Sequence, residues 1–165
     1  MPLVVTHRDD PAEKRWYASV ADFARSKGLS FQESISNEEI ERQTRKIEPD
    51  FIFSFYYRSM LPMSVLKLAR RGAFNMHGSL LPKFRGRAPL NWAILKGETE
   101  TGVTLHEMTE KPDAGGIVDQ QAVPIGPDET AVEVFAKMTD AAELVLRRSI
   151  QSIKKSKCGM GYFCT

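Results

Sequence analysis

Short apolar runs alternate with segments of helical period through the first half of the chain, and this alternation most constrains the fold. Runs typical of buried strands lie at 3–6, 29–31, 50–55 and 73–77, and helices are predicted near 16–24, 36–46 and 63–70. Gly28 fits a C-cap of the first helix, and Ser36 with Glu39 fits a capping box that opens the second. The pattern predicts an α/β fold with a mostly parallel sheet flanked by helices. We expect the run at 50–55 to be buried on both faces of that sheet.

The second half of the chain predicts a different arrangement. A loop rich in Gly, Pro and basic residues at 78–87 leads into a helix at 88–96, and a long amphipathic helix occupies about 130–154. Two strands near 102–109 and 116–123 flank a short loop, so they are expected to pair antiparallel and make the sheet mixed. Ligands of such sheets bind beyond the carboxyl ends of the strands, which directs attention to the loops after Phe55 and His77.

Composition sets the class of protein. The 165 residues are 42% hydrophobic and 27% charged, which is typical of one soluble globular domain. A net charge of +2 argues against nucleic acid or a membrane surface as partner, and no apolar run is long enough to span a bilayer. The two cysteines, Cys158 and Cys164, form neither a disulfide framework nor a metal-ligand spacing, so a cytoplasmic location is expected.

Asn75 and His77 are the first candidates for chemistry. They lie two residues apart on a predicted strand, so they share one face while Met76 points into the core. An amide and an imidazolium side by side can both donate hydrogen bonds to a developing oxyanion. The alternative is that Asn75 caps a turn and His77 is structural.

Asp113 is the third candidate. It lies in a tight turn of Pro and Gly residues, where an aspartate often bonds only to backbone. If the turn folds back over the strand ends, the carboxylate of Asp113 meets His77, favours its imidazolium form and accepts a proton.

Three cations in the loop before the helix at 88–96 suggest an anion clamp. Arg85 and Arg87 are better candidates than Lys83, because guanidinium binds phosphate or carboxylate through two bonds. A solvated surface loop is the alternative. His106 is expected to be exposed or structural, and His7 has no evident partner. Ser79 lacks the sequence context of a nucleophile.

These motifs carry a resemblance. Asn75-x-His77, within Asn-x-His-x-Ser-Leu-Leu-Pro and followed by Asp113, resembles the 10-formyltetrahydrofolate-dependent formyltransferases. That family includes glycinamide ribonucleotide, methionyl-tRNA and sugar N-formyltransferases. The stretches at 53–58, 77–92 and 97–106 are most similar to the formyltransferase domain of a bifunctional lipid A modification enzyme, which formylates UDP-4-amino-4-deoxy-L-arabinose. The resemblance covers roughly residues 4–155 and implies a Rossmann-like formyltransferase fold.

The resemblance also implies roles for particular residues. Asn75, His77 and Asp113 match the catalytic triad. Folate contacts are expected from Ser59, Met60 and Leu61, from Arg87, and from a second loop of Thr109, Glu110, Lys111, Pro112 and Asp113. The implied co-substrate is 10-formyltetrahydrofolate, the implied acceptor is a nucleotide-linked amino sugar, and no metal is required.

Departures from the family pattern define the expected domains. The segment 3–7 aligns with the second strand of the family, so its first strand–helix unit, which supplies a central strand, is missing from these residues. We expect a partial catalytic domain over 1–155 and a tail of unknown role over 156–165, with fused domains or further copies as partners. Three alternatives stay open. The first is a glycinamide ribonucleotide formyltransferase, which the loop at 85–92 fits poorly. The second is a methionyl-tRNA formyltransferase, which is disfavoured because a tRNA-binding domain is not expected in these residues, and the third is a fragment without turnover.

Overall fold

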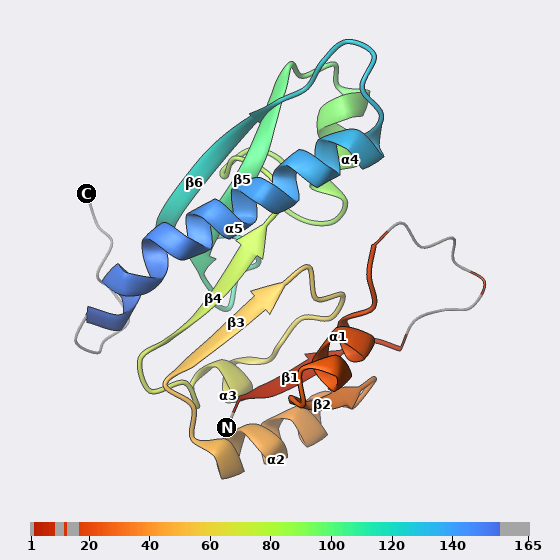
Figure 1. The fold of residues 1–165 in the computed structure, drawn as a ribbon. Coiled ribbons are helices and arrows are strands. Elements are labelled where there is room, and N and C mark those ends of the chain that lie inside the picture. The colour runs from red at the N-terminus through yellow and green to blue at the C-terminus, as the bar shows by residue number, and fades with distance from the viewer. Residues whose placement is uncertain (1, 9–11, 13–16, 156–165) are drawn as a thin grey trace.

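The fold was described from a computed structural model, which defines residues 2–8, 12 and 17–155. Figure 1 shows the elements in chain order. These are β1 (Leu3–Thr6), α1 (Val20–Ser26), β2 (Ser30–Glu33), α2 (Asn37–Ile47), β3 (Phe51–Phe55), α3 (Met63–Leu66), β4 (Gly72–His77), α4 (Pro89–Leu95), β5 (Glu100–Glu107), β6 (Ile117–Pro124) and α5 (Ala131–Lys155). The α/β class is therefore confirmed. Trp16 and the tail with Cys158 and Cys164 lie outside the described residues.

The strands form two sheets rather than one mostly parallel sheet. β1 pairs in parallel with β2, and a second sheet has the order β3-β4-β5-β6. Within it β3 and β4 are parallel, whereas β4–β5 and β5–β6 are antiparallel. The antiparallel pairing of the last two strands was predicted, but that of β4 with β5 was not. The loop and the short α4 bring the chain back to the end of the sheet where β4 finishes. β5 therefore starts beside the carboxyl end of β4 and runs in the opposite direction.

Local signals explain where two of the helices begin and end. The hydroxyl of Ser36 accepts from the backbone N–H of Glu39 at 3.3 Å, so the predicted cap of α2 is confirmed. The helix expected over 63–70 ends at Leu66 instead. Its continuation is prevented because the backbone N–H groups of Arg70 and Arg71 donate to Pro49 and Asp50, which draws the chain towards the start of β3.

The main core lies between the four-stranded sheet and α5, which runs across β5 and β6 (Figure 1). Side chains spaced three or four residues apart along α5 are buried against the sheet: Val134, Met138, Ala141, Val145, Ser149 and Ile153. Met76, Val103 and Leu105 meet them from the strands and are at most 1% exposed. The predicted inward orientation of Met76 is confirmed. This packing fixes β4 and β5, which carry the candidate residues.

The prediction that 50–55 is buried on both faces is wrong. Every residue of β3 is at least partly exposed and Phe55 is 47% exposed, because β3 is the outer strand of its sheet. All four residues of β1 are likewise only half-buried.

One histidine joins β1 to the loop after β3. The ring of His7, expected to have no partner, accepts from the backbone N–H of Arg58 at 3.1 Å and stacks on Tyr57 with ring centroids 4.4 Å apart. Burial, and then the charge of Arg58, lower the pKa of His7 below its ordinary 6.5, which keeps the ring neutral as an acceptor.

We predict that the 165-residue chain self-associates through the open edges of β1 and β3, because unpaired edges of apolar strands template further pairing. Analytical ultracentrifugation should show larger species over roughly 1 to 100 μM. Thr6→Lys places a charge on the β1 edge and should reduce association. Thr139→Lys, on an exposed position of α5, adds the same charge away from both edges and serves as the control. A monomer with one sharp unfolding transition at every concentration would contradict the prediction.

Candidate functional site

The pairing of β4 with β5 gathers four polar side chains on one face of the sheet. Asn75 lies opposite His106, and His77 lies opposite Thr104. Directly opposed residues of antiparallel strands share a face and have neighbouring side chains. This face is the reverse of the one that carries Met76 and Leu105 into the core, so the polar cluster forms at the surface of a packed layer.

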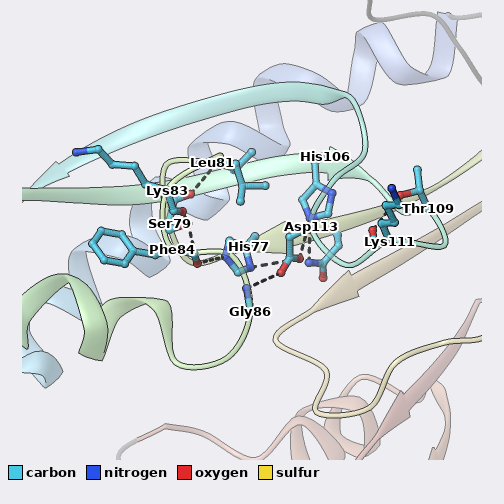
Figure 2. A network of polar contacts seen from close by, with 12 residues as sticks. His77, Ser79, Leu81, Lys83, Phe84, Gly86, His106, Thr109, Lys111 and Asp113 are labelled. Atoms are coloured by element: carbon cyan, nitrogen blue, oxygen red, sulfur yellow. Dashed lines mark hydrogen bonds and ion pairs between the residues drawn. The ribbon is translucent and has the colours of Figure 1, made fainter.

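His77 is held by the loop that follows it. Its Nε2 lies 2.9 Å from the carbonyl oxygen of Phe84, and since a carbonyl only accepts, this nitrogen carries a proton. Its Nδ1 lies 3.5 Å from Oδ1 of Asp113, and the side chain is 7% exposed (Figure 2). Nδ1 is therefore the nitrogen that remains for chemistry.

Thr104 fixes the position of the loop over His77. Its hydroxyl donates to the carbonyl of Ser79 at 2.6 Å and accepts from the backbone N–H of Leu81 at 3.1 Å. Gln120 on β6 donates to the same hydroxyl at 2.8 Å. The hydroxyl of Ser79 donates to the carbonyl of Lys83 at 2.6 Å, which makes it a structural group. Sequence reasoning missed Thr104 and Gln120, whose roles depend on strand pairing.

Asp113 reaches the cluster from the loop between β5 and β6. Its backbone has φ of 49°, a left-handed conformation uncommon outside glycine, and its Oδ2 accepts from the backbone N–H of Gly86 at 2.9 Å. Gly115 permits the tight turn, since a Cβ there would lie 2.0 Å from the carbonyl oxygen of Glu107. Figure 2 shows Asp113 on its folded-back turn beside His77 and His106. Asn75 joins them through its contact with His106, so the structure brings Asn75, His77 and Asp113 together.

Asp113 is held in its ionised form. Burial acts to raise the pKa of this carboxyl, but contacts with His106, the Gly86 N–H and His77 outweigh it, so the pKa lies below its ordinary 3.8.

Of the two readings expected for His106, exposed or structural, the structure supports the second. The side chain is 2% exposed, and its Nε2 lies 3.2 Å from Nδ2 of Asn75 and 3.4 Å from Oδ1 of Asp113. It shares the carboxylate with His77. The signal was present in the alternation Thr104-Leu105-His106, but only the pairing of β5 with β4 reveals which side chains it meets.

Of the residues expected to contact folate, Asp113 belongs to this cluster, and the others lie outside its hydrogen bonds and ion pairs. Ser59 and Met60 are exposed, and Leu61 is half-buried, in the loop after β3. Arg87 is exposed next to Gly86, and so is Arg85. In the second loop, the hydroxyl of Thr109 donates to the carbonyl of Lys111 at 3.0 Å, and Glu110, Lys111 and Pro112 are exposed. Their contacts with a ligand stay a prediction.

Residues 2–8, 12 and 17–155 contain no cluster of three or more His, Cys, Asp or Glu side chains arranged to hold a metal ion. None of the helices in this part of the chain is long and apolar enough to cross a membrane.

Comparison with known proteins gives a consistent result. A family model described as formyl transferase matches residues 1–150. The phosphoribosylglycinamide formyltransferase of Anaplasma phagocytophilum is 25% identical, with 82% of this chain and 68% of that chain covered and a TM-score of 0.73. Glycinamide ribonucleotide transformylase 1 of Geobacillus kaustophilus is 27% identical, covering 88% and 81%, with a TM-score of 0.68. WlaRD, a sugar 3N-formyl transferase solved in the presence of dTDP and 5-N-formyl-THF, is 25% identical, covering 98% and 56%, with a TM-score of 0.72.

We predict that Asp113→Asn destabilises the chain at neutral pH but not in acid. A carboxyl whose folded pKa is lowered stabilises the fold above its unfolded value, and this contribution is lost as pH falls through the folded value. The free energy of unfolding in urea should drop by about 1.5–3 kcal/mol near pH 7, the scale of a hydrogen bond to a charged group. The difference from wild type should shrink as pH falls below 3.8 and disappear once pH lies below the lowered pKa of Asp113. Asp128→Asn, at an exposed position, controls for loss of one negative charge. Equal destabilisation at both pH values would show that the charge of Asp113 is unimportant.

Proposed function

Since the chain belongs to the formyl transferase family, whose model matches residues 1–150, we propose that it transfers a formyl group from 10-formyltetrahydrofolate to the amine of a nucleotide-linked amino sugar. The observation that carries the proposal is the convergence of Asn75, His77 and Asp113 on one face of the sheet. The match to the family model supports the prediction that the chain is a folate-dependent formyltransferase. The co-substrate and the acceptor belong to the proposal.

The chemistry follows from the positions of the three side chains. The neutral amine attacks the formyl carbon, a C–N bond forms, and the carbonyl electrons move onto oxygen. Asn75 and the Nδ1–H of protonated His77 donate to this oxyanion, whose charge is greater than that of the ground-state carbonyl. Collapse breaks the bond to the folate nitrogen, which leaves with a proton from His77 or from a water beside it. The products are the formamide and tetrahydrofolate.

Asp113 has two tasks in this scheme. As a carboxylate it pairs with the imidazolium form of His77, whose Nδ1 then donates rather than accepts. It can also accept the proton that the attacking amine loses and pass that proton to solvent. The contact of 3.5 Å between Asp113 and His77 is long for a hydrogen bond, and it leaves room for the Nδ1–H to be shared with the oxyanion.

The acceptor class is inferred from the loop before α4. The sequence over 85–92 resembles that of the formyltransferase domain of ArnA, which formylates UDP-4-amino-4-deoxy-L-arabinose. Two exposed guanidinium groups there, Arg85 and Arg87, suit a diphosphate. Glycinamide ribonucleotide is the second candidate, because it also joins a phosphate to a primary amine and because two of its formyltransferases are 25% and 27% identical to this chain.

A panel assay separates these acceptors. The chain is incubated with 10-formyltetrahydrofolate and, in turn, UDP-4-amino-4-deoxy-L-arabinose, a dTDP-linked 3-amino sugar and glycinamide ribonucleotide, and the formylated product is detected by mass. Formylation of a nucleotide sugar alone supports the proposal, and formylation of glycinamide ribonucleotide alone overturns the acceptor class. Absence of all products while folate still binds identifies a fragment without turnover.

We predict that Asn75→Ala and His77→Ala each lower kcat by about 10²-fold, the effect of removing one oxyanion donor. KM for both substrates should change little, because the donors act mainly in the transition state. Steady-state kinetics on the formylated acceptor measure both constants. Ser79→Ala is the comparison, since its hydroxyl supports the loop and touches neither donor. Effects confined to KM would mean that Asn75 and His77 bind substrate without stabilising the oxyanion.

A further inference from the structure

A second buried imidazole faces the carboxylate of the proposed triad. Oδ1 of Asp113 lies 3.4 Å from Nε2 of His106 and 3.5 Å from Nδ1 of His77. The two rings stand edge to face with centroids 6.4 Å apart (Figure 2). The mechanism above uses one of these rings and leaves the other unexplained.

Backbone carbonyls fix a proton on the far nitrogen of each ring. Nδ1 of His106 lies 2.8 Å from the carbonyl oxygen of Glu107, and Nε2 of His77 lies 2.9 Å from that of Phe84. Carbonyl oxygens only accept, so both of these nitrogens donate. The nitrogen that each ring turns towards Asp113 is therefore bare whenever that ring is neutral.

A bare ring nitrogen and a carboxylate repel one another, so a proton between them stabilises the contact. Oδ1 of Asp113 lies 3.4 Å from Nε2 of His106 and 3.5 Å from Nδ1 of His77, and it accepts from neither ring while both nitrogens are bare. One proton on either ring converts a repulsive contact into a charge-assisted hydrogen bond to Oδ1. His77 and His106 compete for that proton.

Asn75 decides the competition. Its Nδ2 lies 3.2 Å from Nε2 of His106, and this amide nitrogen only donates, so His106 must accept. Protonating His106 forfeits this bond and leaves two donors facing each other. Protonating His77 forfeits nothing, because its Nδ1 has Asp113 as its partner.

We propose that His106 is a positioning residue: neutral and protonated on Nδ1, it orients the carboxamide of Asn75 by accepting from it, and it leaves the shared proton to His77. This role of His106 deepens the proposed function. Its kinetic test depends on formyl transfer, whereas its spectroscopic test does not. The titratable groups that face the His106 ring are Asp113 on the loop after β5 and His77 on β4; Glu107 faces it through its backbone carbonyl.

The role has a consequence for pH dependence. A proton added to Nε2 of His106 would take the place of the hydrogen bond from Asn75. The amide of Asn75 then loses its acceptor and its fixed orientation, so one oxyanion donor is misplaced and kcat declines. A glutamine at 106 can place an amide oxygen where Nε2 lies, and it does not titrate in this range.

Ring nitrogens report the proton positions without any turnover. The chain has three histidines, so two-bond ¹H–¹⁵N correlation spectra are simply assigned with His7→Gln, His77→Gln and His106→Gln. We expect neutral His106 to carry its proton on Nδ1, and His77 to gain a second ring proton before His106 as pH is lowered. His7, whose Nε2 accepts from Arg58, should also be an Nδ1–H tautomer and serves as the reference. A proton on Nε2 of neutral His106, or earlier protonation of His106, overturns the proposal.

Kinetics test the consequence for Asn75. His106→Leu removes the acceptor and should lower kcat about 10-fold, the scale of one net hydrogen bond, with KM values within about twofold. His106→Gln should recover most of the kcat lost in His106→Leu. It should also lack the part of the acid decline of kcat that wild type owes to His106, whereas the part due to protonation of the sugar amine is the same in wild type and His106→Gln. An equal loss of kcat in His106→Leu and His106→Gln would show that the His106 ring only fills space. The same conclusion would follow if kcat of His106→Gln declined in acid as it does in wild type. If wild type formylates no acceptor, the proposed function fails and the spectra still decide the role of His106.

Discussion

The antiparallel pairing of β4 with β5 is the constraint on which the site depends. It sets Asn75 against His106 and His77 against Thr104 on one face, and turns Met76 and Leu105 to the core beneath α5 on the other. Because side chains alternate along a strand, a slip of one residue would exchange the two faces, bury polar groups under α5 and expose the core. The packing of α5 therefore protects the register of the site as well as the stability of the sheet.

Loops of unusual conformation complete the site around this rigid pair of strands. Left-handed backbone occurs at Phe84, Ala88 and Asp113, although none of them is glycine. Such conformations persist where surrounding bonds enforce them, and here Thr104 and Gln120 anchor the first loop while the Gly86 N–H ties it to Asp113. The carbonyl of Phe84 reaches His77 as a result, so the loop conformation determines which nitrogen of the ring carries the fixed proton.

Sequence reasoning succeeded where the signal is local. The strand positions, the Ser36 cap and the pairing of β5 with β6 follow from periodicity, capping chemistry and loop length, and Asn75 and His77 share a face because they are two residues apart. It failed where the answer depends on which strands are neighbours. The burial of 50–55 was overestimated because the run cannot reveal that β3 lies at a sheet edge. The choice between an exposed and a structural His106 stayed open because its partner, Asn75, lies thirty-one residues away on β4.

The proposed chemistry and the first expected folate loop depend on different parts of the molecule. Asn75 and His77 lie on β4, on the face of the sheet opposite the core beneath α5, and Asp113 joins them from the loop after β5. Ser59, Met60 and Leu61 instead follow β3, and the start of their loop rests on β1 through the stacking of Tyr57 on His7 and the bond from Arg58. Movement between the two sheets would therefore displace the expected folate loop while leaving His77 and Asp113 in contact. A strand that pairs with the edges of β1 and β3 should therefore change the affinity for folate. It should leave the geometry of His77, His106 and Asp113 unchanged.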